Sequence, residues 1–135
     1  MTLILCLDKK GGMMLFGKRQ SKDRILREEL LGKIGEGRLV ISPYTKGQFE
    51  EDFPFTVSPA PHEEGKEGDF LFLEDTPLPK EGVNRVILYR WNRAYPADLF
   101  FPEKEYLSSF CRVAKRDFKG SSHEKITEEI WERKK

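Results

Sequence analysis

The residues of this chain that could do chemistry gather in its first third. Asp23 stands at the start of a predicted helix, and a carboxyl group there can act as a general acid or base when its surroundings tune its proton affinity. Basic residues crowd the same helix start, and together they could bind an anionic ligand such as a nucleotide. They are Lys18, Arg19, Lys22, Arg24 and Arg27. Each feature also has a purely structural interpretation. The helix dipole favours any acid in a first turn, which would account for Asp23, and a run of charges usually marks a solvated helix face, which would account for the basic residues.

Other reactive residues form weaker patterns. His62 and His123 are far apart, and no His, Cys or carboxylate spacing is typical of zinc, so we expect no metal. Ser121-Ser122-His123 has the residue types of a nucleophile and base, but the pattern is that of a polar hairpin tip. Gly11-Gly12 lacks the Lys-Ser/Thr ending of a phosphate-binding loop and predicts a turn.

Composition limits the partners. The 24 basic and 23 acidic residues nearly cancel, so no global field attracts nucleic acid or an anionic membrane, and we expect neither as a partner.

A length of 135 residues with 38% hydrophobic residues fits one domain, 1–135. The run Leu3–Leu7 is too short for a signal peptide or a membrane span, which predicts a cytoplasmic protein. Cys6 and Cys111 lie in apolar segments and are expected to be reduced core thiols.

Two continuous apolar runs, Thr2–Leu7 and Arg38–Ser42, predict strands that are covered on both faces. The helix between them is expected to have Ser21 as its cap and Asp23 in its first turn. Strand, helix and strand of this size predict a right-handed crossover.

The rest of the chain predicts further strands and one short helix. In Thr45–Glu51, Thr45 and Gln48 have the spacing of a capping box. Strands are predicted at Thr56–Ser58, Phe70–Leu73, Asn84–Trp91 and Phe110–Arg116, with a hairpin connection at 118–122. Glu124–Arg133 fits a helix by propensity and a strand by alternation, and this choice stays open.

The order of these features resembles the opening of dihydrofolate reductase: strand Leu3–Leu7, Asp8, Gly11-Gly12-Met13, Asp23 with its helix, strand Leu39–Ser42 and Thr45. Further on, Val86–Tyr89, Asp98 and Phe101-Pro102 are similar to a late strand of that family and the loop after it. The segment 110–133 is similar to its final hairpin, which favours the strand reading. The resemblance implies a single α/β domain, reduced in size, with a mixed sheet, few helices and a C-terminal antiparallel hairpin.

The resemblance also implies a site. Asp23 matches the acid that binds the pterin and assists its protonation, and Thr45 matches a residue on the NADPH side. The ligand would lie in a cleft between the first strand, the Asp23 helix and Tyr89. The substrate-binding residues implied are Ile4, Leu5, Cys6, Arg24, Arg27 and Tyr89.

Several family residues are replaced here. Arg24 and Arg27 stand where apolar residues normally line the pterin pocket, although a shift by one residue would bring Ile25 and Leu26 there. The tryptophan before the acid, the arginine for the NADPH phosphate and the Gly-Gly pair of a later strand are absent. We therefore expect a divergent protein without ordinary NADPH-dependent folate reduction that binds a small heteroaromatic or anionic ligand. The alternatives are a functional NADPH-dependent pterin or folate reductase and a non-catalytic structural or assembly protein.

Overall fold

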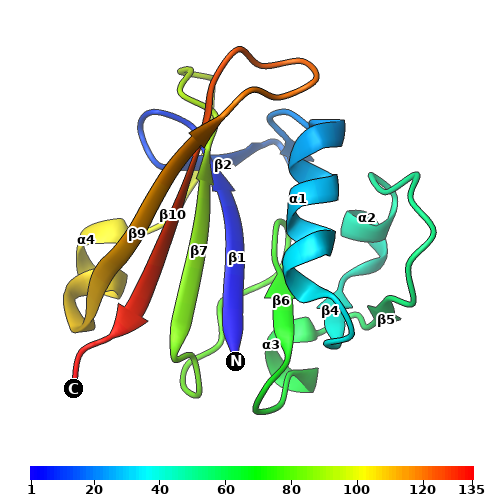
Figure 1. Cartoon of the computed structure of the whole chain (residues 1–135), viewed down its shortest axis with the longest axis vertical. Helices are drawn as coiled ribbons and strands as arrows, with labels where there is room; N and C mark the ends of the chain where they lie inside the picture. The colour runs from blue at the N-terminus through cyan, green and yellow to red at the C-terminus, as the bar shows by residue number, and fades with distance from the viewer.

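A seven-stranded mixed sheet forms the centre of the molecule in the computed structural model, which describes residues 1–135 (Figure 1). Its strands are β1 Thr2–Leu7, β4 Leu39–Ile41, β5 Thr56–Val57, β6 Phe70–Phe72, β7 Arg85–Arg90, β9 Phe110–Phe118 and β10 Ile126–Arg133. They lie in the order β5-β4-β6-β1-β7-β10-β9, parallel from β5 to β7 and antiparallel from β7 to β9. The predicted mixed sheet and C-terminal hairpin are confirmed, and 126–133 is a strand.

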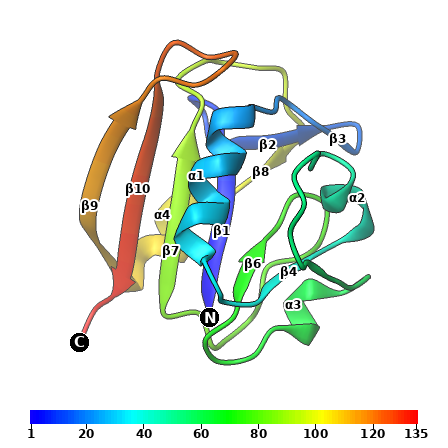
Figure 2. The same cartoon turned by 45° about the vertical axis from the view of Figure 1, so that its right-hand side comes forward.

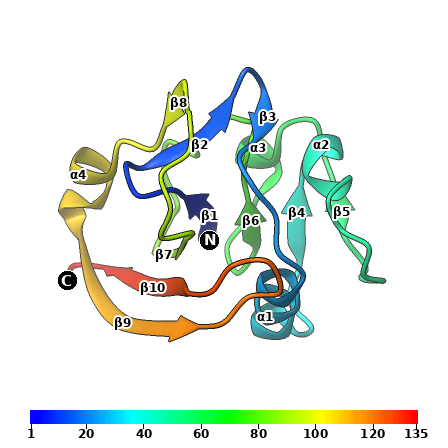
Figure 3. The ribbon, with the colours of Figure 1, turned by 90° about the horizontal axis from the view of Figure 1, so that it is seen from above.

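A smaller sheet and short helices complete the fold. The small sheet joins β3 Lys18–Arg19, β2 Gly12–Leu15 and β8 Leu99–Phe100. The helices are α1 Arg24–Ile34, α2 Pro43–Lys46, α3 Pro61–Glu64, α4 Glu103–Tyr106 and the 3₁₀ turn Leu107–Ser109. Seen from above, α1 lies on one side of the large sheet, while β2, β8 and α4 lie on the other (Figure 3). None of these helices combines the length and apolar character needed to span a bilayer.

The core has two parts because β1 and β7 are covered on both faces. Leu3, Leu5 and Leu7 of β1 pack on one face with Phe101 and Leu107, whereas Ile4 packs on the opposite face, against α1. The continuous apolar runs follow from this double coverage.

Asp23 is the N-cap of α1, so the prediction of Ser21 as cap with Asp23 in the first turn is wrong. The Asp23 backbone is extended, with φ −152° and ψ 128°, and its side chain accepts a hydrogen bond from Leu26 N. Aspartate is among the best N-cap residues, because its short side chain reaches the free amides. The helix therefore begins at Arg24 and ends before Gly35, whose φ of 55° suits glycine.

Helix α2 starts earlier than predicted. Ser42, not Thr45, is its cap, and Ser42 Oγ accepts a hydrogen bond from Thr45 N at 3.1 Å. Pro43 follows as the first helical residue, where its missing N–H costs nothing. The expectation that Cys111 is a core thiol is also wrong, since Cys111 is exposed on the edge strand β9.

Candidate functional site

The Asp23 carboxylate lies at the meeting point of α1 and the β9–β10 connection. Besides capping Leu26 N at 3.1 Å, it accepts hydrogen bonds from Ser121 N at 3.0 Å and Ser122 N at 2.9 Å. His123 Nδ1 lies 2.9 Å from Asp23 Oδ2. The Asp23 side chain has 0% exposed surface. Asp23 thus ties the C-terminal hairpin to the start of α1, and no lone pair of its carboxylate faces an open cleft.

This network keeps Asp23 ionised. Burial alone would raise the pKa of Asp23, but hydrogen bonds from His123, Ser122, Ser121 and Leu26 outweigh it and hold that pKa well below its usual value. A carboxylate only accepts hydrogen bonds, so His123 Nδ1 carries the hydrogen. Such a carboxylate orients its partners and is a poor proton donor near neutral pH.

His123 extends the network to two hydroxyl groups. Its Nε2 lies 2.9 Å from Ser21 Oγ and 3.3 Å from the Tyr95 hydroxyl. Its ring stacks on Trp91 with centroids 4.4 Å apart. The order Asp23, His123, Ser21 is one in which a histidine could accept a proton from a serine. His123 is only 4% exposed, however, and in this conformation it serves as a buried link.

The space beside this network is small. Ser21, Cys6 and Trp91 line a cavity of about 10 Å³, together with Met13, Arg19, Gln20, Leu73 and Glu74. That volume holds about one water molecule. Burial and then the negative charge of Glu74 raise the pKa of the Cys6 thiol well above its usual value, so Cys6 is a poor nucleophile. A pterin-sized ring would fit only if the segment 9–22, which carries β2 and β3, moved away.

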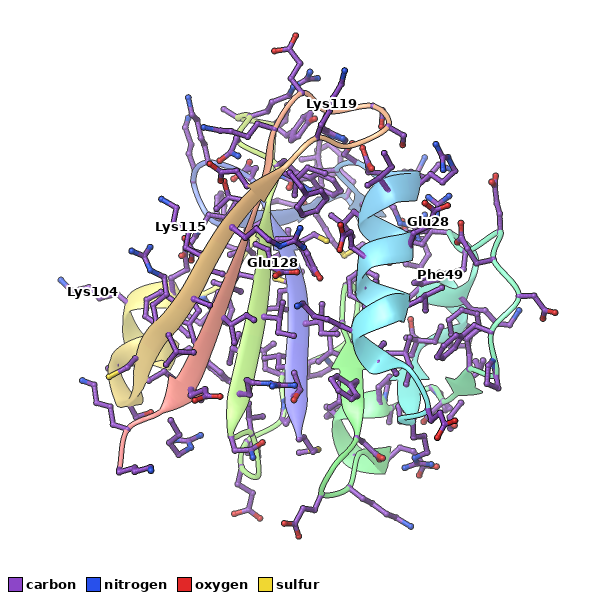
Figure 4. The ribbon with its side chains drawn as sticks, viewed as in Figure 1. Glu28, Phe49, Lys104, Lys115, Lys119 and Glu128 are labelled. Atoms are coloured by element: carbon purple, nitrogen blue, oxygen red, sulfur yellow. The ribbon has the colours of Figure 1, made fainter.

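The structure separates the other predicted ligand residues. Ile4 and Tyr89 pack in the core beneath α1, while Leu5 packs on the opposite face of the sheet. The Tyr89 hydroxyl donates to Glu128 Oε2 at 2.9 Å, and burial followed by this carboxylate raises the pKa of Tyr89 far above its usual value. Glu128, on the face that α1 covers, also pairs with Lys33 (Figure 4). The Tyr89 hydroxyl therefore donates its hydrogen bond within the protein and is not available to a ligand.

Arg24 and Arg27 do not converge on Asp23. Arg24 is about half exposed and pairs with Glu28 of the same helix at 3.0 Å. Arg27 is buried and bonds Glu51 at 2.9 Å, on the side of α1 nearer to α2. Of the five basic residues, only Lys18 and Lys22 lack an acidic partner in the structure.

Acidic side chains occupy the start of α2. Thr45 Oγ1 donates to Glu74 Oε1 at 2.9 Å, and Ser42 Oγ donates to Asp75 Oδ1 at 2.7 Å. Glu74 also binds Arg19 through Nε at 3.0 Å. The two carboxylates therefore occupy the hydroxyl groups at the first turn of α2. Thr45 is fully buried and donates its hydroxyl hydrogen to protein.

Sequence reasoning missed the partners of Asp23. His123 is 100 positions from Asp23 in the chain, Tyr95 contacts His123 and not Asp23, and the pairing of β10 with β7 brings these residues near. The Ser121-Ser122-His123 tip was the available signal, since three consecutive polar residues next to a hairpin can cap another element. No group of three or more His, Cys, Asp or Glu residues is arranged to hold a metal ion.

Comparisons with known proteins bear on the fold. No family model and no curated protein sequence matches the chain. A solved structure does match: dihydrofolate reductase from Enterococcus faecalis, complexed with NADP(H) and RAB-propyl, with a TM-score of 0.67 and 15% identity. The superposition covers 99% of this chain and 96% of that one. This chain has a dihydrofolate reductase-like fold.

The dihydrofolate reductase-like fold confirms the predicted resemblance over nearly the whole chain. The structural match covers 99% of the chain, including the segments between the features that carry the sequence resemblance. An identity of 15% establishes the arrangement of elements and leaves chemistry to the individual side chains. In this chain the side chains of Asp23 and Thr45 are both bonded to other groups of the protein.

Proposed function

We propose that this chain is a dihydrofolate reductase-like protein that has lost NADPH-dependent folate reduction and binds a small heteroaromatic or anionic ligand. The loss of NADPH-dependent reduction is inferred from the pair of carboxylates at α2. Glu74 and Asp75 accept the hydroxyl hydrogens of Thr45 and Ser42. A phosphate of NADPH placed there would meet the charge of Asp75 and would have to compete with Glu74 for Arg19, which disfavours binding.

The bonding of Asp23 supports the same conclusion. Its carboxylate accepts hydrogen bonds from three backbone amides and from His123. A pterin would have to displace the β9–β10 connection to reach it. Removing those partners would leave buried polar groups unpaired, at a cost of roughly 1–3 kcal/mol each.

The proposal that the protein binds a ligand rests on two lysines without acidic partners and on a small cavity beside them. Lys18 and Lys22, within the segment 9–22, have no acidic partner, so positive charge is available there. Cys6, Met13, Leu73 and Trp91 give the neighbouring cavity apolar walls, and it would enlarge if that segment moved. Ile4 and Cys6 would then form the floor of the site.

The second candidate is a working NADPH-dependent reductase, favoured by the match to a reductase structure that is complexed with NADP(H). In that case Asp23 would be the catalytic acid and Thr45 would contact the cofactor. Arg24 and Arg27 would need to leave their acidic partners to contact a substrate.

The test is an assay of the full chain with NADPH and dihydrofolate, followed by the absorbance of NADPH and by thermal shift with NADPH alone. We expect no oxidation of NADPH and no shift. Saturable NADPH binding with consumption of dihydrofolate would overturn the proposal in favour of the reductase. Thermal shifts with folates and nucleotides then test the binding role, because a ligand that prefers the native state raises its stability.

A variant sharpens this assay. Glu74→Gln combined with Asp75→Asn removes both charges at nearly constant size, and we expect it to bind NADPH more tightly than the parent. Glu28→Gln is the matched control, because Glu28 is an exposed acid on the outer part of α1 and pairs only with Arg24.

A further inference from the structure

The tip of the β2–β3 hairpin carries an unusual residue. Leu15 pairs with Lys18 across a two-residue turn of Phe16 and Gly17, whose φ angles are 50° and 73°. Turns with positive φ at both central positions favour Asn-Gly, and a bulky side chain there is strained. Phe16 is 81% exposed, so its burial does not offset the strain. A strained and exposed aromatic residue points to a role other than stability.

Phe16 borders a groove of about 290 Å³ on the outer side of the hairpin. The hairpin contributes Leu15, Phe16 and Lys18, and the facing loop contributes Tyr95 and Pro96. Figure 2 shows the hairpin extending from the large sheet toward α2, with β8 beside β2. The groove is at the lower end of the size range of small-molecule sites, which suits a ligand of one or two rings.

The lining of the groove has a defined chemistry. Phe16 and Tyr95 offer aromatic faces, and Lys18 is a cation without an acidic partner, whereas the Arg19 guanidinium is held by Glu74. Two acids adjoin the groove and are bonded within the protein: Asp98 accepts a hydrogen bond from Phe16 N at 3.1 Å, and Asp8 accepts hydrogen bonds from Gln20 Nε2 and Tyr95 N, both at 3.1 Å. Two aromatic side chains and a lysine without an acidic partner together match a planar ring that carries a negative charge.

We propose that this groove is the binding site for a planar heteroaromatic anion, with its ring against Phe16 and Tyr95 and its charged group at Lys18. The inference rests on the proposed binding function and moves its site from the closed cavity at Cys6 to the outer face of the hairpin. A ligand in this groove would contact the buried hydrogen-bond network through Tyr95, because the Tyr95 hydroxyl contacts His123 Nε2.

The experiment is an amide NMR titration of the full chain with AMP and nicotinate, each beside its neutral counterpart, adenosine and nicotinamide. We expect at least one of the two anions to shift the amides of residues 15–20 and 95 saturably. Phe16→Asn should weaken that binding about tenfold through the lost ring contact. It should also raise the melting temperature, which a residue needed only for folding would not do.

The charge is tested separately. Lys18→Ala should weaken binding of the anion about fivefold and leave the neutral counterpart unchanged. Lys119→Ala and Phe100→Ala are matched controls, an exposed lysine without an acidic partner and an exposed aromatic residue, both outside the groove lining. Binding that is insensitive to Phe16→Asn and shifts residues around Cys6 and Trp91 would overturn the groove while keeping the binding function. No saturable shift with any probe would overturn both.

Discussion

The two ends of the 9–23 segment differ in how their polar and aromatic groups are used. At Asp23 the carboxylate is fully buried and accepts bonds from α1 and from the β9–β10 connection. At the hairpin tip, Phe16 is exposed in a strained conformation and Lys18 has no acidic partner. Residues whose interactions are complete inside the protein contribute to stability, whereas strained and unpaired surface groups are available to a ligand. Asp23, which the sequence resemblance matches to a catalytic acid, has its carboxylate bonded within the protein.

Removal of the Asp23 carboxylate should have the largest effect. Asp23→Ala removes the α1 cap and leaves His123 and two amides without their acceptor, so we expect the free energy of unfolding to fall by about 3 kcal/mol. Urea denaturation measures the change. Arg24→Ala, at an exposed ion pair on the same helix, is the control and should change stability by less than about 0.5 kcal/mol. Equal effects of the two changes would contradict the structural role of Asp23.

Gly120→Ala tests the fit between the β9–β10 connection and Asp23. An added Cβ would collide with Asp23 Oδ2 and would lie 2.8 Å from Ile126 Cδ1. Because neither atom can move freely, we expect a loss of about 2 kcal/mol in thermal or urea unfolding. Gly32→Ala is the matched control, since a Cβ there meets nothing within 4 Å and alanine favours a helix. A neutral Gly120→Ala would mean that the connection is loosely held.

The pH dependence of stability follows from the lowered pKa of Asp23. Its contribution is fully present above the unfolded value, about 4, and is lost as the pH falls below that value toward the folded pKa. In this window the parent should lose up to about 1.4 kcal/mol per pH unit more than Asp23→Asn. Denaturation at several acidic pH values measures both proteins. Parallel profiles would show that the Asp23 pKa is the same folded and unfolded.

Phe16→Asn should have the smallest effect on stability and the opposite sign. Asparagine tolerates positive φ and forms the favoured Asn-Gly turn, so we expect stabilisation of about 1 kcal/mol. Thermal unfolding compares it with Phe100→Ala, an exposed aromatic change in the neighbouring strand. A destabilised Phe16→Asn protein would mean that the ring supports the fold, and the strain argument would fail.

Sequence patterns predicted the main strands and the helix α1, but they did not predict the hydrogen bonds of Asp23. The apolar runs of β1, β4 and β7 and the spacing of α1 predicted their elements, because burial on two faces leaves a continuous signal. Ile126, Glu128 and Ile130 alternate in a segment that propensity alone would make helical, and pairing with β7 decided it. The bonding of Asp23 to His123 joins residues 100 positions apart, and no local pattern carries that information. The Phe16-Gly17 turn could not be predicted from sequence, because its first residue is aromatic where this type of turn usually has asparagine.

Native-state hydrogen exchange of the Ser121 and Ser122 amides tests most directly whether Asp23 is committed to structure. Both amides donate to its carboxylate, so they exchange only when the connection leaves Asp23. We predict that their opening free energies approach that of global unfolding. Openings of only a few kcal/mol, well below the global value, would show that Asp23 is readily released to a ligand and would contradict the account.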